Sequence, residues 1–140
     1  MKNEMNLEFD SISENEAFAR VVAASFATQL NPNLEEIDDI KTVVSEAVTN
    51  SIIHGYPDEC GKIFMHCMIE DKNLHITIMD RGIGILDVKK AMEPMYTTKG
   101  DKERSGMGFC FMEAFMDELN VESKVGEGTT ITMMKTIGTV

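Results

Sequence analysis

The sequence has 140 residues, of which 43% are hydrophobic and 26% are charged, a balance typical of one soluble globular domain over residues 1–140. The formal net charge of −11 argues against direct nucleic-acid binding, because a phosphate backbone repels an acidic protein without a large basic patch. No apolar stretch approaches the roughly 20 residues that cross a bilayer, so we expect no membrane partner.

The cysteines indicate a reducing compartment. Cys60, Cys67 and Cys110 lack the spacing of metal ligands, and the first residues contain no signal-type apolar run. We therefore expect reduced thiols, most of them small buried hydrophobes, in a cytoplasmic protein.

The first elements alternate between strand and helix patterns. Apolar and polar residues alternate over residues 5–10, which predicts a half-buried strand. Ser13 and Glu16 have the S-x-x-E spacing of a capping box, so we expect a helix over residues 13–30.

A second helix is expected after Asn31-Pro32-Asn33 and should continue to about His54. Its predicted core-facing residues recur at helical spacing: Ile37, Ile40, Val44, Ala47, Val48, Ser51 and Ile52. Two strands joined by a short turn are then expected over residues 63–70 and 74–80.

The remaining elements complete an α+β pattern. We expect a short helix over residues 87–92, a polar segment over 97–105 and a helix over 106–119. A closing hairpin is predicted over residues 121–125 and 129–137. Strand pairs with helices grouped between them predict a two-layer α/β sandwich, in which helices cover one face of a mixed sheet.

Glu46 and Asn50 lie four residues apart on the second predicted helix and therefore share one face. A carboxylate there could accept a proton, and an amide oxygen could hold a magnesium ion. Taken alone, the pair also fits a solvated helix surface.

Asp80 falls in phase with the apolar side of its predicted strand, so its carboxylate should meet a partner. An exocyclic amine such as that of adenine would satisfy it. Gly82 and Gly84 follow and allow the chain to approach a ligand closely. A turn aspartate with two turn glycines is the simpler alternative.

Two further glycine motifs accompany this aspartate. The run Arg104-Ser105-Gly106-Met107-Gly108 opens an apolar helix, where free N–H groups and the helix dipole favour anionic oxygens. Arg104 precedes the helix and could contact a terminal phosphate. The run Gly126-Glu127-Gly128-Thr129-Thr130 is a tight turn followed by hydroxyls. Each motif alone also fits an ordinary helix end or hairpin turn.

The four motifs together resemble the ATPase/kinase superfamily shared by gyrase, Hsp90, histidine kinases and MutL. The N-box resembles residues 45–56, the first glycine box Asp80-Arg81-Gly82-Ile83-Gly84, and the second Gly106-Met107-Gly108. Within the superfamily, residues 103–109 with Met112-Glu113 are similar to the anti-sigma factors of endospore-forming bacteria, and the likeness extends over the whole length.

This resemblance implies a Bergerat-type ATP-binding fold and a set of residue roles. Glu46 would be the general base for a substrate serine, Arg104 would touch the terminal phosphate, and Asn50 would bind Mg²⁺. Residues 97–105 would close over ATP. The expected ATP/ADP-binding residues are Asn50, Asp80, Gly82, Gly84, Thr97, Thr98, Ser105, Gly106, Met107, Gly108, and Thr129 or Thr130.

The resemblance also implies partners. The protein would hold a sporulation sigma factor, sigma factor F or a related late sigma factor, away from RNA polymerase. It would also phosphorylate a serine of an anti-anti-sigma antagonist, and it would form a homodimer. Arg20, the lone charge in residues 17–30, is expected at a partner-contact surface, although a helix-edge charge is an alternative.

Three rival interpretations remain open. A histidine kinase catalytic domain would need a phosphoacceptor histidine on a preceding helical hairpin, for which the residues before the N-box helix leave no room. A pure binding module would keep the nucleotide only as a structural ligand. The related stress-response anti-sigma factors share all the motifs.

Overall fold

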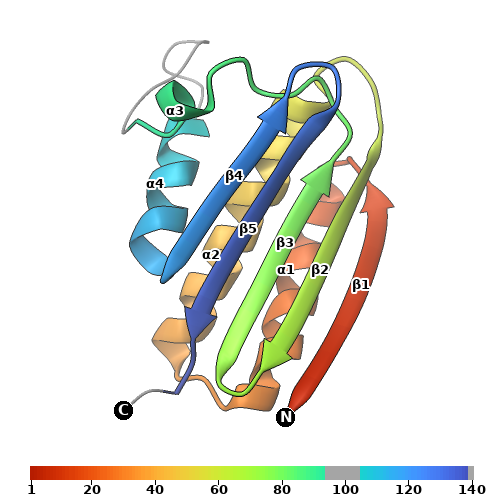
Figure 1. Cartoon of the computed structure of the whole chain (residues 1–140). Helices are drawn as coiled ribbons and strands as arrows, with labels where there is room; N and C mark the ends of the chain where they lie inside the picture. Colours follow the sequence, from red (N-terminus) through yellow and green to blue (C-terminus); the bar gives the residue numbers. More distant parts are fainter. Residues whose placement is uncertain (94–104, 139–140) are drawn as a thin grey trace.

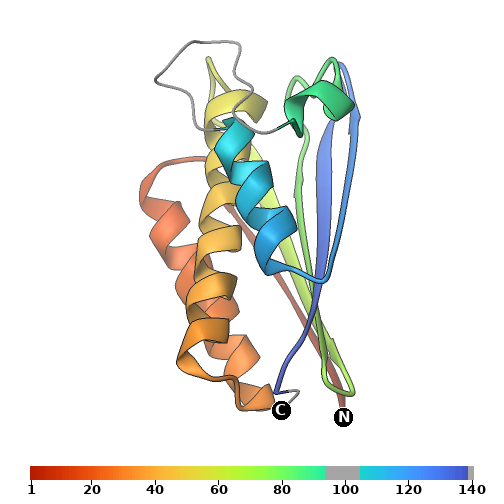
Figure 2. The same ribbon diagram turned by 90° about the vertical axis from the view of Figure 1, so that its left-hand side faces the viewer.

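The computed structural model describes residues 1–93 and 105–138, with the side chains of residues 105–108 left undescribed. A five-stranded sheet forms one layer and the long helices form the other (Figures 1 and 2). The elements are β1 (Lys2–Asp10), α1 (Glu14–Ala27), α2 (Leu34–Asn50), β2 (Lys62–Glu70), β3 (Asn73–Asp80), α3 (Val88–Ala91), α4 (Ser105–Phe115), β4 (Glu118–Lys124) and β5 (Gly128–Thr136). The expected α+β sandwich with helices on one face is confirmed.

The sheet is antiparallel at every strand pairing, so the expectation of a mixed sheet is wrong. Its order is β1-β2-β3-β5-β4. The two long helices α1 and α2 run down and back up in Figure 1, and therefore β2 starts at the end where β1 finished. β4 does run in the same direction as β3, but β5 inserts between them and pairs antiparallel with both.

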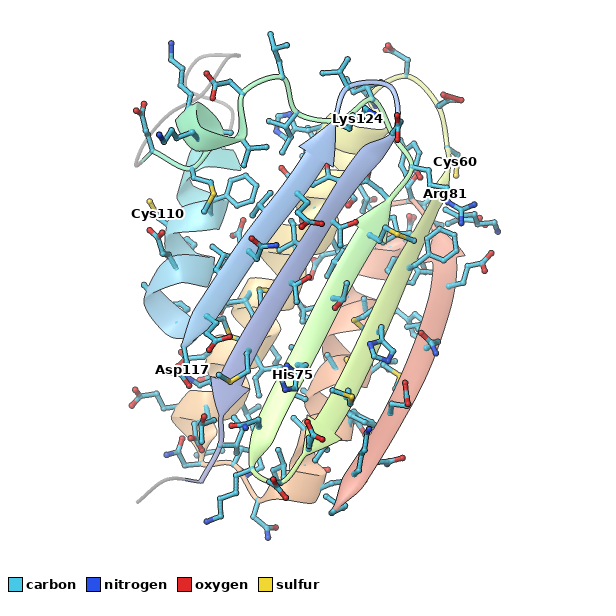
Figure 3. All side chains as sticks on the ribbon, viewed as in Figure 1. Cys60, His75, Arg81, Cys110, Asp117 and Lys124 are labelled. Carbon is cyan, nitrogen blue, oxygen red and sulfur yellow. The ribbon has the colours of Figure 1, made fainter. Side chains whose placement is uncertain are left out.

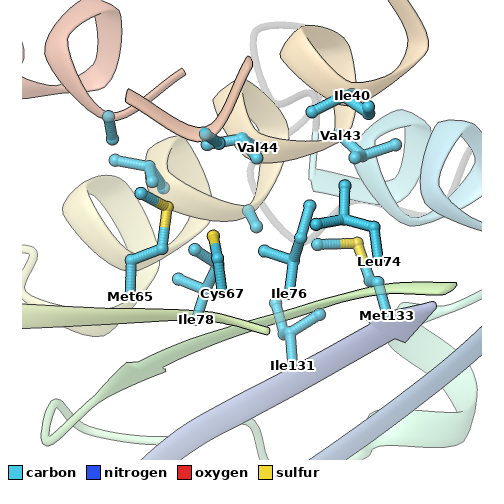
Figure 4. Close-up of a cluster of buried hydrophobic side chains, with 14 of the residues drawn as sticks. Ile40, Val43, Val44, Met65, Cys67, Leu74, Ile76, Ile78, Ile131 and Met133 are labelled. Atoms are coloured by element: carbon cyan, nitrogen blue, oxygen red, sulfur yellow. The ribbon is translucent and has the colours of Figure 1, made fainter. Parts of the chain in front are cut away.

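The core lies between the two layers (Figure 4). Alternate residues of β2, β3 and β5 face the helices and are buried: Ile63, Met65, Cys67, Ile69, Leu74, Ile76, Ile78, Ile131 and Met133. α2 contributes Ile40, Val43, Val44, Ala47 and Val48. α1 buries only alanines, Ala19, Ala23, Ala24 and Ala27, whose small side chains let the helix approach closely. Val43, which we did not place on the core-facing stripe of α2, is completely buried.

Both long helices begin near the predicted positions. The capping box that was predicted at the start of α1 is found at the start of α2 instead. Ser13 makes no side-chain cap bond at the start of α1. Asn33 caps α2 instead: its Oδ1 accepts the Glu36 N–H at 2.7 Å, and Glu36 Oε1 accepts the Asn33 N–H at 2.9 Å. Glu16 does not take part in a capping box, because its carboxylate accepts hydrogen bonds from Arg20 and Ser45.

Two helix ends differ from the predictions. α2 gives way after Asn50 to a wider turn over residues 51–55, closed by a bond from the Tyr56 N–H to the Ser51 carbonyl at 3.0 Å. α4 ends at Phe115 rather than at Leu119, because the Asp117 N–H bonds to the Met134 carbonyl at 2.8 Å and turns the chain into β4. Within residues 1–93 and 105–138, no helix has the length and apolarity needed to span a bilayer.

Candidate functional site

The sequence motifs meet at one end of the molecule, the upper end in Figure 1. The end of α2, the end of β3, the turn between β4 and β5, and the first turn of α4 all lie there. Because α2 and α4 lie on the covered face of the sheet, the residues of β3 that point inward meet the helices at this end. The motif residues are far apart in sequence, and the fold brings them into one region.

Asp80 is the last residue of β3, points to the covered face and is only 2% exposed. Its Oδ2 accepts the Ser51 hydroxyl at 2.7 Å, and its Oδ1 accepts the Gly82 N–H at 2.9 Å. The buried carboxylate therefore has the partners that its sequence position requires. Each carboxylate oxygen can accept a further hydrogen bond, so Asp80 keeps capacity for a ligand donor.

Glycine is required at positions 82 and 84 for different structural reasons. A Cβ at Gly82 would lie 2.0 Å from the Gly55 carbonyl oxygen, so only glycine lets these two backbone segments touch. Gly84 has a φ of 81° and also lies against the backbone of Lys124. The Ile83 N–H donates to the Gly55 carbonyl at 2.9 Å. This bond joins the loop that contains Gly82 and Gly84 to the wide turn over residues 51–55.

The structure distinguishes between Thr129 and Thr130, the first two of the four threonines of β5. Thr129 pairs with Asp80 in register, shares its face and is 4% exposed. Its hydroxyl lies 2.7 Å from the Ser123 hydroxyl, which in turn accepts the Ile85 N–H at 2.7 Å. Thr130 pairs with Met79 on the opposite face, because successive side chains of a strand alternate. Only Thr129 shares the face of Asp80.

Glu46 and Asn50 share one side of α2, as the spacing predicted. Asn50 is 7% exposed, and Glu46 is half-buried and has polar contacts of its own. Among the residues that the structure describes, no group of three or more His, Cys, Asp or Glu side chains could hold a metal ion. An amide-held magnesium ion does not need such a group, since Mg²⁺ keeps several of its waters.

The glycine motif that opens α4 is only partly described. The backbone of Ser105, Gly106, Met107 and Gly108 forms the first turn of α4, so its N–H groups lie at the end where Asp80 lies. Thr97, Thr98 and Arg104, and with them residues 97–104 of the segment expected to close over ATP, fall outside the described residues.

Arg20 lies on α1 and is held by its own helix. Its Nη1 donates to Glu16 Oε2 at 3.0 Å, and the Ser45 hydroxyl of α2 donates to the same oxygen. The Arg20 side chain remains 42% exposed. Its position is therefore fixed by Glu16, while part of the side chain stays accessible.

Among the residues that the structure describes, Tyr56 and Cys67 have a pKa raised chiefly by burial. Burial raises the pKa of the Tyr56 hydroxyl, although the hydrogen bond from the Arg81 N–H opposes the shift. Burial alone raises the pKa of the Cys67 thiol to about 12. Both groups are consequently neutral at physiological pH.

Several contacting residues had no role in our sequence-based site. Ser51, Ser123 and Tyr56 each join segments 25 or more positions apart, through bonds to Asp80, Ile85 and Arg81. Serine and tyrosine are common at helix ends and in strands, so no local pattern could have identified these bonds.

The outer face of the sheet carries two open depressions on either side of Arg81, with volumes of about 540 and 490 Å³. Arg81 points outward there, 5.0 Å above the Phe64 ring centroid, and Figure 3 labels it in the upper half of the molecule. The Asp80 side chain points to the other face, but Asp80 and Thr129 also contribute to the lining of the larger depression.

The donor and acceptor set at the inner face fits an adenine nucleotide. The buried carboxylate of Asp80 can accept an exocyclic amine, and Gly82 and Gly84 allow the backbone segments next to it to pack closely. The N–H groups that begin α4 suit phosphate oxygens.

Comparison with known proteins agrees with this geometry. The histidine kinase-like ATPase domain family matches residues 11–135, so the fold and site define a histidine kinase-like ATPase. Anti-sigma F factors of Clostridium acetobutylicum and Bacillus subtilis are 58% and 54% identical to the chain. The alignments cover 96% of this chain and 94% and 93% of those proteins. The chain belongs to the anti-sigma F factor family.

Solved structures support the fold at low sequence identity. The RsbU and RsbW domains of Rv1364c from Mycobacterium tuberculosis match with a TM-score of 0.69 at 19% identity, over 96% of this chain and 32% of that one. The catalytic domain of the histidine kinase ThkA matches with a TM-score of 0.59 at 18% identity, over 95% and 96% of the two chains.

Proposed function

We propose that this chain is an anti-sigma factor and an ATP-dependent serine protein kinase. It would bind and inhibit sporulation sigma factor F and phosphorylate a serine of its anti-anti-sigma antagonist. The observation that carries the proposal is the buried Asp80 carboxylate, held by Ser51 and Gly82 at the end of the sheet where Glu46, Asn50 and the start of α4 also lie.

Nucleotide binding would use this chain's residues in three roles. Asp80 would accept the adenine amine, with Thr129 beside it on the same face. Asn50 would hold Mg²⁺, which neutralises phosphate charge when bound. The N–H groups of Ser105 to Gly108 would receive phosphate oxygens. The roles of Thr97, Thr98 and Arg104 remain predictions of the resemblance.

Phosphoryl transfer would require alignment and a base. The serine oxygen of the antagonist would form a bond to the terminal phosphorus of ATP as the bond to the bridging oxygen breaks, leaving ADP. Glu46 would take the serine proton. A positioned general base contributes typically about 10²–10⁴-fold to a rate.

The decisive experiment uses labelled ATP, Mg²⁺ and the candidate antagonist. Glu46→Gln should reduce transfer by about 10²-fold or more while ATP affinity stays within about twofold. Glu113→Gln, at an exposed position of α4, is the matched control and should leave both unchanged. Undiminished transfer in Glu46→Gln would reject the base role, and nucleotide binding without any transfer would favour a pure binding module.

Partner binding would involve α1. The partly accessible Arg20 side chain could meet an acidic group of the sigma factor or the antagonist, while Glu16 keeps it in place. Arg20→Ala should weaken capture of sigma factor F, and capture by a stress-response sigma factor instead would reassign the partner. We also propose a homodimer in the cytoplasm, which light scattering of the purified protein would test.

A further inference from the structure

Tyr56 makes an unusual pair of hydrogen bonds beside the candidate site. Its hydroxyl accepts the Arg81 N–H at 2.7 Å and donates to the Lys62 carbonyl at 2.7 Å. The last pair of the β2–β3 ladder is Ile63 with Asp80, so Lys62 and Arg81 are the next residues opposite one another. The hydroxyl thus bridges two backbone groups where the regular ladder stops.

This bridge fixes the backbone immediately after Asp80. The Arg81 side chain points away over Phe64, so Tyr56 acts on the main chain and not on the guanidinium. Beyond Arg81, Gly82 lies against the Gly55 carbonyl and donates to Asp80 Oδ1. Tyr56 and Gly55 together therefore clamp the loop that holds one carboxylate oxygen in place.

We propose that Tyr56 is a positioning residue for base recognition: its hydroxyl sets the path of residues 80–82 and thereby the orientation of the Asp80 carboxylate toward the exocyclic amine. This inference rests on the proposed ATP site and adds a residue that does not touch the nucleotide. Loss of the hydroxyl should impair recognition of the amine more than recognition of the phosphates, because the start of α4 is unaffected.

The test compares two nucleotides in Tyr56→Phe, which keeps the ring and removes the hydroxyl. The dissociation constants of ATP and of purine riboside triphosphate, which lacks the amine, are measured by calorimetry. In the wild type the missing amine should weaken binding by about ten- to a hundredfold, the value of a hydrogen bond to a charged group. In Tyr56→Phe this ratio should fall by about threefold or more.

A matched control removes a hydroxyl from the other end of the same sheet. Thr136 Oγ1 donates to Asn73 Oδ1 at 2.8 Å, so Thr136→Val deletes a comparable bond far from Asp80. Its ratio should equal that of the wild type. An unchanged ratio in Tyr56→Phe, with affinity for both nucleotides lowered equally or not at all, overturns the proposal.

A second variant covers the case in which Tyr56→Phe does not fold. A Cβ at Gly61 would lie 2.3 Å from Cε1 of the Tyr56 ring, so Gly61→Ala displaces the ring while retaining the hydroxyl. The ratio should fall in this variant as well, and an unchanged ratio counts against the proposal. Wild-type protein that binds neither nucleotide would overturn the proposed function itself, which is a different result.

Discussion

Asp80 shows how one residue acquires its function from its surroundings. The alternation along β3 turns its side chain inward, where burial alone would be costly for a carboxylate. The Ser51 hydroxyl and the Gly82 N–H compensate for that burial. The result is a charged acceptor with a fixed direction, the property needed to distinguish an amine from other groups.

Replacing Asp80 by Asn tests this property with little change of shape. The amide oxygen can still accept the Gly82 N–H, and the amide nitrogen can donate to the Ser51 hydroxyl, so the fold should remain. ATP affinity should fall by about ten- to a hundredfold, because a charged acceptor is lost. Calorimetric titration measures it, with circular dichroism as the check on folding. Unaltered affinity would remove Asp80 from the base pocket.

Cys67 predicts an alkaline loss of stability. Its pKa is raised from 9.0 to about 12 in the folded chain, so only the unfolded chain releases the proton above pH 9. The free energy of unfolding should therefore fall by about 1.4 kcal/mol per pH unit between pH 9 and the folded pKa. Below pH 9 the Cys67 thiol is protonated in both the folded and the unfolded chain, so this loss of stability is absent there.

Urea unfolding at pH 8.5, 9.5 and 10.5 measures this slope. Cys67→Ala should be less stable overall because of the cavity it leaves, but its stability should depend less on pH. Cys60→Ala, which removes an exposed thiol, should keep the wild-type slope. Equal slopes in all three proteins would contradict the assignment to Cys67.

At the scale of elements, local patterns predicted where strands and helices form and where β2 and β3 end, but not how α2 and α4 end. The strand ends of β2 and β3 lie within one residue of expectation, since strict alternation marks them clearly. The early end of α4 and the wide turn after Asn50 depend on bonds to Met134 and between Ser51 and Tyr56. The first of these is long-range, and neither has a sequence signal.

The two helix starts give a direct comparison of capping. Asn33→Ala removes a side chain that accepts the Glu36 N–H, and should cost about 1 kcal/mol of unfolding free energy. Ser13→Ala is the paired control and should cost much less, because the Ser13 side chain makes no cap bond. Denaturant unfolding of both variants measures the difference. A larger loss in Ser13→Ala would contradict the observed capping.

At the scale of the whole molecule, the sequence predicted the layers but not the strand order. Hydrophobic patterning requires helices on one face of a sheet, and that much follows from the elements alone. The insertion of β5 between β3 and β4 follows from long-range pairing, such as that of Asp80 with Thr129. This pairing also places Thr129, and not Thr130, beside Asp80.

The net charge of −11 predicts a salt response of the whole fold. Raising NaCl from about 20 to about 200 mM shortens the screening length, so self-repulsion should fall and the urea midpoint should rise. Glu113→Lys reduces the excess negative charge at an exposed helix position, so its urea midpoint should rise less with NaCl. A midpoint that falls with NaCl would mean that the exposed ion pairs, such as Lys62 with Asp10, outweigh the repulsion.

The ends of the described chain have a practical use. The Met1 carbonyl accepts the Asp71 N–H in the β2–β3 turn, and the Gly138 N–H lies 3.2 Å from Glu36 at the start of α2. Both points are at the lower end in Figure 1, a full strand length from Asp80. A fluorophore or an immobilisation handle joined there would leave the end of the molecule that contains Asp80 open to solution. Sensor-chip assays with a nucleotide or with a partner protein should therefore not be blocked by the attachment.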